Sequence, residues 1–202
     1  YKKNTSRRKF TFVKGDILNK GLINRLITKH KIKKIIHLAA QAGVRHSINN
    51  PRKYIDVNIV GFLNILEACR KNKISHLIYA STSSVYGANT NFPFLEKKSA
   101  DHPVQLYAVT KRSNELMAHS YSSMFKLPTT GLRFFTAYGP FGRPDMALYL
   151  FAKNISENKK INVFNYGNHT RDFTYVEDVA EAVMKILKIG FKKEKNWNNK
   201  TP

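Results

Sequence analysis

The sequence is short of three features, and each absence narrows what the protein can be. Cys69 is the single cysteine in 202 residues, so no disulfide can form within the chain, and we expect a reducing, cytoplasmic environment. No run of 18 apolar residues occurs, which predicts that no helix spans a membrane. The start, YKKNTSRRKF, has neither an initiator methionine nor the apolar core of a signal peptide, so we expect the chain to belong to a longer protein.

Acidic residues are also scarce, since 13 Asp and Glu stand against 35 Lys and Arg, a formal net charge of +22. Such a balance raises the question of a nucleic-acid partner. The basic residues are scattered, however, and their clusters at 2–9, 30–34 and 192–200 are not interleaved with exposed aromatic or Gly residues in the pattern of a single-strand-binding protein. Neither a helix-turn-helix pattern nor a zinc-ligand spacing occurs. We therefore expect a solvated basic surface, no nucleic-acid partner and no metal site.

What the sequence does contain is an alternation of strand-like and helix-like segments. Short β-branched or aromatic runs predict strands at 10–13, 33–39, 77–80, 129–135 and 162–165. Apolar residues at helical spacing predict helices at 20–30, 50–73, 106–125, 146–158 and 176–187. Strand, helix and strand at this spacing indicate parallel pairing, so we predict an α/β fold with a doubly wound parallel sheet.

The stretch from Leu77 to Lys111 carries the most informative side chains. Its strand runs into the hydroxyl cluster at 81–84, and Tyr107 and Lys111 lie four residues apart on one face of the next helix. A phenol with an ordinary pKa of about 10 is a poor base at neutral pH unless a nearby cation, here Lys111, favours its phenolate. About one Tyr-x-x-x-Lys pair is expected by chance. The position of the pair, with Thr82 lying 25 residues before Tyr107, is what indicates a functional site.

Six segments match a known pattern: FVKGDI (12–17), HLAAQAGVRHS (37–47), STSSVYG (81–87), YAVTK (107–111), GLRFFTAYGPFGRPDMAL (131–148) and RDFTYVEDVAEA (171–182). Together they resemble the extended short-chain dehydrogenase/reductase family of NAD-dependent epimerases and dehydratases, and within it the sugar-nucleotide epimerases that act on UDP-glucuronate. One departure is that the Gly-rich dinucleotide loop of the family belongs before residue 1.

The resemblance implies a Rossmann-like NAD-binding domain at 1–137 that lacks its Gly-rich first strand, turn and helix. It further implies the start of a smaller substrate lobe at 138–173, a returning helix at 174–189 and a tail at 190–202. NAD is the implied cofactor and a UDP-sugar the implied substrate. The helices at 50–73 and 106–125 resemble the pair that forms the family's four-helix bundle, which implies a homodimer. We expect the 202-residue chain alone to be inactive.

The resemblance also assigns roles to matching residues. It implies catalysis by Thr82, Tyr107 and Lys111. It implies NAD contacts for Asp16, Ile17, Leu38, Ala39, Ala40, Asn58, Tyr107, Lys111 and Phe135. It implies substrate contacts for Thr82, Ser83, Ser84, Thr136, Arg143 and Arg171.

The reaction implied by the resemblance is 4-epimerisation. Tyr107 phenolate removes the proton of the sugar 4-hydroxyl while NAD⁺ accepts the C4 hydride, and return of the hydride to the other face converts UDP-glucuronate to UDP-galacturonate. The alternatives within the family are a UDP-glucose 4-epimerase, a dehydratase and a UDP-glucuronate decarboxylase. An inactive basic binding module on the same fold is an alternative of another class. Ser83 and Ser84 favour the epimerase, because related dehydratases and decarboxylases have Asp or Glu in this region.

Overall fold

A computed structural model describes residues 10–88, 92–97, 100–168 and 170–190, and its centre is a parallel sheet of three strands. β1 (Lys34–His37), β2 (His76–Thr82) and β3 (Thr129–Phe134) lie in the order β1-β2-β3. Both pairs are parallel, with Ile36 beside Ile78 and Ser81 beside Arg133. β2 is central and almost wholly buried, which is why its sequence is a continuous apolar run and not an alternating one.

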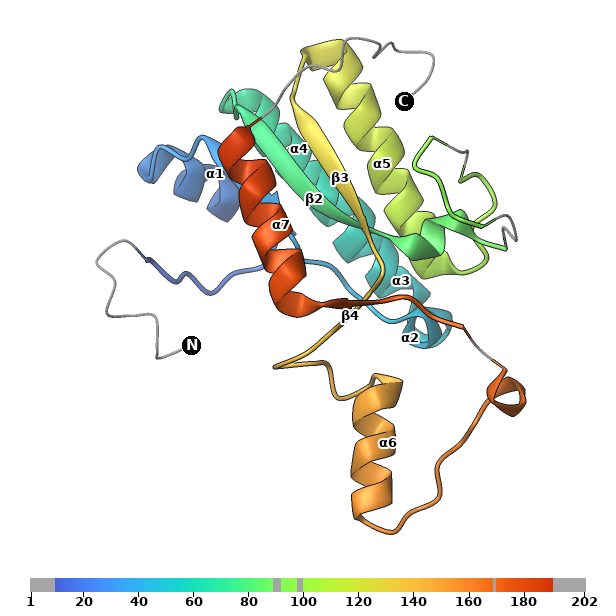
Figure 1. Cartoon of the computed structure of the whole chain (residues 1–202). Helices are drawn as coiled ribbons and strands as arrows, with labels where there is room; N and C mark the ends of the chain where they lie inside the picture. Colours follow the sequence, from blue (N-terminus) through green and yellow to red (C-terminus); the bar gives the residue numbers. More distant parts are fainter. Residues whose placement is uncertain (1–9, 89–91, 98–99, 169, 191–202) are drawn as a thin grey trace.

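Helices cover both faces of this sheet (Figure 1). α1 (Lys20–Lys29) precedes β1, and the connection from β1 to β2 runs through α2 (Val44–Asn49), α3 (Pro51–Tyr54), a π-helical segment (Ile55–Val60) and α4 (Gly61–Lys71). α5 (Leu106–Phe125) connects β2 to β3. Because right-handed crossovers that progress in one direction place their helices on one face, α4 and α5 pack side by side. α7 (Val176–Ile189) lies on the opposite face in Figure 1.

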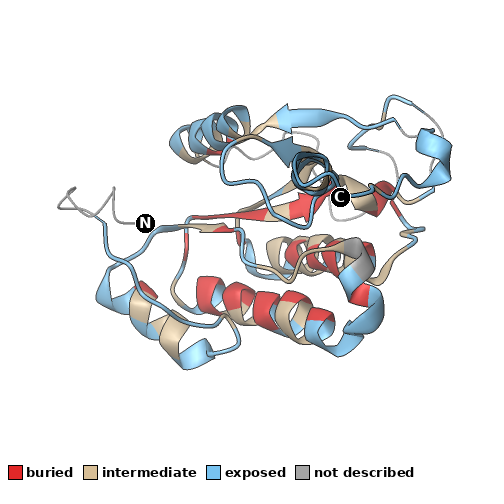
Figure 2. Cartoon of the chain, turned by 90° about the horizontal axis from the view of Figure 1, so that it is seen from below, coloured by how far each residue is buried: buried red, intermediate tan, exposed pale blue. Residues whose placement is uncertain are grey.

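The main core lies between β2 and the helices α1, α4 and α5. Phe62 of α4 is fully buried, and its ring centroid lies 5.5 Å from that of His37 and 5.1 Å from that of Tyr79. Figure 2 shows the buried residues concentrated in the sheet and in the helix layer beneath it. The other members of this core are Ile27, Ile65, Leu66, Ala68, Cys69, Ile74, Leu77, Ala118 and Leu127.

A second, two-stranded sheet follows the first. β4 (Thr136–Tyr138) pairs in parallel with β5 (Phe173–Tyr175), and α7 begins directly after β5. Between these strands, α6 (Ala147–Ser156) and a short 3₁₀ turn (Asn165–Gly167) form a segment that projects away from the main sheet (Figure 1). No residue of α6 is buried, so this segment adds little to the core.

The structure confirms the predicted α/β fold with a parallel sheet, but two predicted strands are wrong. Residues 10–13 are not a strand, and Phe10, Phe12 and Val13 are exposed. Residues 162–165 lead instead into the 3₁₀ turn, and β5 is the strand that pairs with β4. A β-rich composition forms a strand only where it joins the hydrogen-bond ladder of a sheet, and the two sheets of the described residues include neither run. Of the predicted tail, only Gly190 lies within the described residues.

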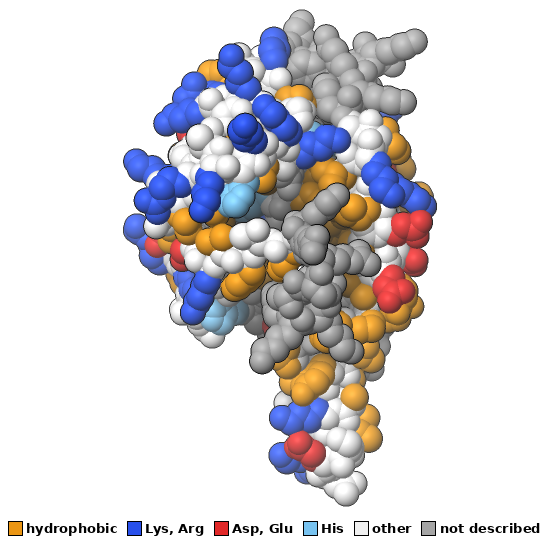
Figure 3. All heavy atoms as spheres, turned by 90° about the vertical axis from the view of Figure 1, so that its left-hand side faces the viewer, with side chains coloured by type: hydrophobic (Ala, Val, Ile, Leu, Met, Phe, Trp, Pro, Cys, Tyr) orange, Lys and Arg blue, Asp and Glu red, His pale blue; other side chains and the backbone are white. Residues whose placement is uncertain are grey.

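The surface reflects the excess of basic residues. Figure 3 shows Lys and Arg side chains spread over the upper part of one face, interrupted by apolar and uncharged side chains, with few acidic ones. In the part of the chain that the structure describes, no helix has the length and apolar character needed to cross a membrane.

Candidate active site

The candidate catalytic residues come from two elements that meet at the carboxyl end of β2. Thr82 is the last residue of β2 and caps the 3₁₀ turn Ser83–Tyr86. Its Oγ1 accepts a hydrogen bond from the Ser84 amide at 3.2 Å and donates to Ser84 Oγ at 3.3 Å. Tyr107 lies in the first turn of α5, which packs against both β2 and this turn. The fold therefore brings the phenol and the Thr82 hydroxyl together.

The surroundings of Tyr107 act on its pKa in opposite directions. Burial of the phenol raises the pKa above its ordinary value, while a hydrogen bond with Thr82 and the positive charge of Arg143 oppose that rise. Tyr54, whose ring lies edge-on at a centroid distance of 6.3 Å, adds to the rise. Because burial prevails, the phenol is protonated at neutral pH, and it acts as a base only where more positive charge faces it.

Lys111 is buried one helical turn after Tyr107. Its ammonium group donates a hydrogen bond to the Ala80 carbonyl at 2.8 Å, and burial lowers its pKa from 10.5 to about 8. The lysine thus ties α5 to the end of β2, a contact that its predicted role beside the phenolate does not include. Burial, assisted by the charge of Lys111, lowers the pKa of His37 to about 4, so His37 is neutral and packs against Phe62 of the core.

Residues predicted to contact a cofactor lie at the adjoining end of β1. Leu38, directly after the strand, is 57% exposed, and Ala39 is exposed beside it. Asn58, buried in the π-helical segment, fixes the loop that follows β1. Its side chain accepts from the Gln41 amide at 2.8 Å and donates to the Gln41 carbonyl at 3.0 Å. An accessible backbone at the carboxyl end of a parallel strand is where α/β proteins bind ligands.

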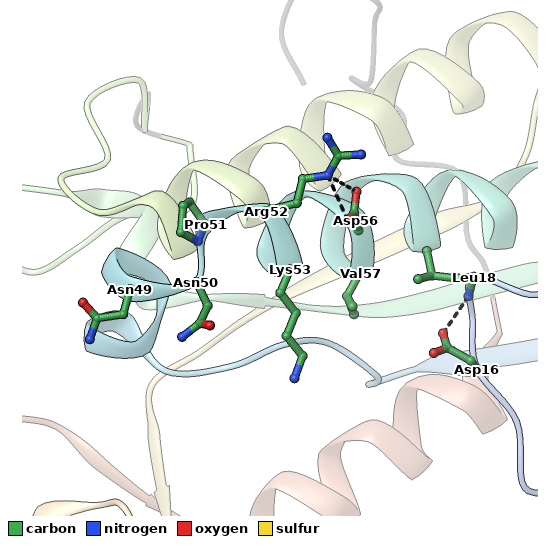
Figure 4. A pocket seen from close by; sticks show the side chains of 9 residues that line it. All are labelled: Asp16, Leu18, Asn49, Asn50, Pro51, Arg52, Lys53, Asp56 and Val57. Carbon is green, nitrogen blue, oxygen red and sulfur yellow. Dashed lines mark hydrogen bonds and ion pairs between the residues drawn. The ribbon is translucent and has the colours of Figure 1, made fainter.

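A cavity of about 580 Å³ lies beside this edge, between the turn at 16–18 and the start of α3 (Figure 4). The Lys53 and Arg52 side chains point in opposite directions from α3, and Arg52 pairs with Asp56 at 2.9 Å. Asp16 lines the cavity and accepts from the Leu18 amide at 2.8 Å. The other lining residues are Leu18, Asn49, Asn50, Pro51 and Val57.

The cavity and the end of β1 both adjoin α4, as the contacts of Ile17 and His37 with this helix indicate. A Cβ at Gly61 of α4 would lie 2.6 Å from Ile17 Cδ1, so the two residues are in close contact. His37 contacts the next residue, Phe62. The two groups of predicted cofactor residues therefore flank the first turn of α4.

Among the residues predicted to bind substrate, Arg143 is brought to Tyr107 by the turn that follows β4. Its Nη2 lies 3.4 Å from where a Cβ would stand at Gly43, whose φ of +107° favours glycine. Its charge acts on both Tyr54 and Tyr107. Asp145 orients the guanidinium through two contacts, one between Arg143 Nε and Asp145 Oδ1 at 3.0 Å and one between Nη2 and Oδ2.

The remaining predicted residues have other surroundings. Ser83 and Ser84 follow Thr82 in the 3₁₀ turn, and Thr136 begins β4. The Phe135 ring lies 6.2 Å from that of Phe94. Arg171 is exposed and donates a hydrogen bond to the Thr170 carbonyl at 2.9 Å. Ala40 is half-buried in the loop after β1.

Three buried polar residues that connect the loop after β1, the π-helical segment and α5 were not predicted from the sequence. The Tyr54 hydroxyl donates to the carbonyls of Gly43 and Ala42 at 2.6 and 2.8 Å. Thr110 Oγ1 accepts from Asn58 at 3.0 Å and donates to the Tyr107 carbonyl at 2.8 Å, and Asn114 donates to the Asn58 carbonyl at 2.7 Å. The signal for the last two was available, because Thr110 and Asn114 follow Tyr107 at helical spacing on the buried face of α5.

Comparison with known proteins identifies the class of this α/β protein. Residues 1–198 match the NAD dependent epimerase/dehydratase family, so the chain belongs to that family. It is 53% identical over 200 residues to Protein CapI of Staphylococcus aureus, which covers 99% of this chain and 60% of that protein. It is 53% identical over 152 residues to a probable UDP-glucuronate 4-epimerase of Rhizobium meliloti, which covers 75% of this chain and 45% of that protein.

A solved structure extends the likeness to three dimensions. The UDP-glucuronic acid 4-epimerase of Bacillus cereus, in complex with UDP-glucuronic acid and NAD, matches with a TM-score of 0.81 and 38% identity. The match covers 93% of this chain and 58% of that one. The chain therefore spans less than two thirds of the length of each of these three relatives.

The burial of Lys111 predicts a pH-dependent cost in stability. Between pH 8 and 10.5 the unfolded chain binds more protons at Lys111 than the folded one, so the cost is full below pH 8 and disappears as the pH rises through this window. The lowered pKa corresponds to about 3 kcal/mol, and the hydrogen bond to Ala80 offsets about 1 kcal/mol. Lys111→Met should therefore raise the free energy of unfolding at pH 7 by about 2 kcal/mol, with the gain vanishing near pH 10.

Urea denaturation of the full-length protein at both pH values measures this difference. Lys188→Met is the matched control, because Lys188 is exposed on α7 and should change stability by less than about 0.5 kcal/mol. A Lys111→Met variant that is less stable than the wild type at pH 7 contradicts the prediction.

Proposed function

We propose that this chain carries the active site of an NAD-dependent 4-epimerase of UDP-hexuronates, which interconverts UDP-glucuronate and UDP-galacturonate. The observation that carries the proposal is the meeting of Tyr107, Thr82 and the charge of Arg143 at the end of β2. The turn beside them has Ser83 and Ser84 and no acidic residue. The likeness to UDP-glucuronate 4-epimerases supports the choice of substrate.

The described residues fit a dinucleotide cofactor. The cavity beside Asp16 offers a carboxylate that can accept from the amine of an adenine, and the exposed end of β1 leaves backbone accessible to a ligand. We assign the binding of NAD to Asp16, Ile17, Leu38, Ala39, Ala40 and Asn58, with Tyr107, Lys111 and Phe135 toward the reacting end. The cofactor supplies an acceptor, and then a donor, for the hydride at C4 of the sugar.

Tyr107 is the proposed acid and base of the reaction. It removes the proton from the sugar 4-hydroxyl and later returns a proton to the same oxygen. Thr82, which hydrogen-bonds the phenol, also bonds this oxygen and aligns it. Because burial raises the pKa of the phenol, the positive charges of Lys111 and Arg143 are needed to make it a base at neutral pH.

The carboxylate of the substrate requires a separate set of contacts. Removal of hydride at C4 makes a uronic acid a β-keto acid, which is prone to lose carbon dioxide. Arg143 can bind the carboxylate through its planar guanidinium, with Ser83, Ser84 and Thr136 offering hydroxyl groups. We propose that these four hold the carboxylate where its loss is disfavoured, and that Arg171 binds the diphosphate.

We also propose that the protein is a homodimer through α4 and α5. These helices pack side by side, and their outer surface bears apolar side chains that are exposed by 38% or more. A four-helix bundle made from the pair in each protomer would bury them. The residues are Ile55, Val60 and Leu63 on the π-helical segment and α4, and Val109 and Leu116 on α5.

Replacement of the proposed base is the first test. Tyr107→Phe keeps the ring but removes the hydroxyl, so turnover of UDP-glucuronate by the full-length enzyme should fall by at least about 10² to 10⁴ while NAD still binds. Tyr121→Phe is the control, because Tyr121 lies on the same helix but bonds Glu67 at 2.8 Å. Turnover is followed by chromatography of the two UDP-hexuronates. Near-normal turnover by Tyr107→Phe would rule out its role as the base.

The second test concerns the carboxylate. Arg143→Ala should raise KM for UDP-glucuronate by about 10- to 100-fold, the range for a lost charged hydrogen bond, and leave KM for UDP-glucose nearly unchanged. Arg70→Ala is the control, since Arg70 forms a comparable pair with Glu67 at 2.9 Å on α4. Because the Arg143 charge also acts on Tyr107, a fall in kcat shared by both sugars is expected. An equal rise in KM for both sugars, or equal efficiency of the wild type toward both, would favour a neutral-sugar epimerase.

A charged side chain introduced at the centre of the proposed interface tests the dimer. Leu116→Glu should convert the full-length protein from dimer to monomer in sedimentation velocity, because two buried carboxylates would face each other across the interface. Lys188→Glu, on α7, should leave it dimeric. A wild-type protein that sediments as a monomer at micromolar concentration contradicts the proposal.

A further inference from the structure

Glu115 is the centre of a charged cluster on the side of β2 that α5 covers. Its Oε1 accepts from Ser81 Oγ at 2.5 Å and from Arg133 Nε at 2.9 Å. Its Oε2 accepts from Arg112 Nη1 and Arg133 Nη2, each at 2.9 Å. The Glu115 side chain is 12% exposed and those of both arginines 16%, so these charge-assisted hydrogen bonds are largely shielded from water.

The position of Glu115 on α5 connects the cluster to the candidate catalytic residues. Tyr107, Lys111 and Glu115 follow one another at four-residue steps, so all three lie on one face of the helix. Their partners are consecutive on β2, because Lys111 donates to the Ala80 carbonyl, Glu115 accepts from Ser81, and the Thr82 side chain acts on the pKa of Tyr107. These three contacts set the position of α5 along the end of the strand.

Arg133 connects Glu115 to the 3₁₀ turn that contains Ser83 and Ser84. It lies beside Ser81 in the register of β2 and β3, and its guanidinium lies 4.8 Å from the ring centroid of Tyr86. Tyr86 is the last residue of the 3₁₀ turn Ser83–Tyr86. Arg133 also donates to the Glu96 carbonyl at 3.4 Å, in the loop that follows. Glu115 therefore joins the helix, the strand end and the turn.

The carboxylate is ionised in this setting. Burial acts to raise the pKa of Glu115, but hydrogen bonds from Arg133 and Ser81 outweigh it, so the pKa is lowered. Loss of the charge would leave the largely buried Arg133 guanidinium without its anion and Arg112 with Asp101 alone, at 3.1 Å, so the two guanidinium groups would separate. Such a movement displaces Ser81, and with it the adjacent Thr82.

We propose that Glu115 is a positioning residue of the active site, which holds Tyr107 at hydrogen-bonding distance from Thr82 by binding Ser81 and Arg133 together. The proposal rests on the proposed function for the identity of the substrate. Glu115 itself touches neither Thr82 nor Tyr107 in any described hydrogen bond, so its effect passes through its partners.

Glu67 of α4 provides a matched comparison within the chain. It accepts from the Tyr121 hydroxyl at 2.8 Å and from Arg70 Nε and Nη2, each at 2.9 Å, so it binds one hydroxyl and one guanidinium, whereas Glu115 binds one hydroxyl and two guanidinium groups. Neither Tyr121 nor Arg70 belongs to the candidate site. Substitution of Glu67 therefore reports the loss of such a cluster without displacement of β2.

The test compares Ser81→Ala, Glu115→Gln, their double variant and Glu67→Gln in the full-length enzyme. Ser81→Ala should lower kcat about 10-fold and Glu115→Gln about 10- to 100-fold, the range for a small misplacement of reacting groups, with KM changed less than about twofold. If Glu115 acts through Ser81, the double variant should be no slower than Glu115→Gln. Glu67→Gln should retain kcat. Circular dichroism establishes that each variant is folded.

A second readout needs no substrate. Loss of the Thr82 hydrogen bond removes one of the two factors that lower the pKa of Tyr107, while Arg143 and Tyr54 still face the phenol. The Tyr107 titration is measured as the absorbance difference between each variant and its Tyr107→Phe counterpart. It should move to higher pH in Ser81→Ala and Glu115→Gln and stay unchanged in Glu67→Gln.

The outcomes separate this proposal from the proposed function. If the wild type converts neither UDP-glucuronate nor UDP-glucose, the proposed function fails, and the titration alone decides on Glu115. An unchanged titration in both Ser81→Ala and Glu115→Gln would overturn the positioning role, as would a kcat loss shared equally by Glu67→Gln. Should Glu115→Gln fail to fold, Ser81→Ala decides, because it removes only a hydroxyl group.

Discussion

The hydrogen bond from the buried Lys111 ammonium to the Ala80 carbonyl is the contact on which the candidate site depends. It anchors α5 to the central strand within one helical turn of Tyr107. Placing this ammonium among buried groups is costly, as its pKa of about 8 shows, and one carbonyl compensates only in part. A helix that only apolar side chains hold against a strand end could shift along the strand without loss of a buried hydrogen bond. The cation gives α5 one preferred position.

Two polar systems support that contact from opposite sides. On one side, Asn58, Thr110 and Asn114 connect the loop after β1 to the backbone of Tyr107. On the other, Glu115 connects α5 to Ser81 and Arg133. Between them lies an end of the sheet where the usual apolar packing is replaced by hydrogen bonds with fixed directions. Such an arrangement suits a site in which a hydroxyl and a phenol must stay aligned.

Arg143 reaches this edge from a different part of the chain. It lies in the turn after β4, over Gly43 and within electrostatic reach of Tyr107. The first sheet therefore supplies the proposed acid–base chemistry, whereas the turn that follows β4 supplies the proposed recognition of a carboxylate. The two are coupled, however, because the charge of Arg143 also acts on the pKa of Tyr107.

Local patterns in the sequence determined much of this protein. Helical periodicity predicted α1, α5 and α7 closely, and the apolar run before a hydroxyl cluster predicted β2, because such patterns report which faces of an element are buried. The match of six segments pointed to the family and to Tyr107, Lys111 and Thr82.

Only the tertiary structure decided the rest. Residues 10–13 and 162–165 have strand-like composition but belong to neither sheet of the described residues, whereas residues 173–175 pair with β4. The roles of Thr110, Asn114 and Glu115, and the raised pKa of Tyr107, depend on what lies across the interface between α5 and β2. Strand pairing and burial arise from residues far apart in the chain, and no local pattern contains them.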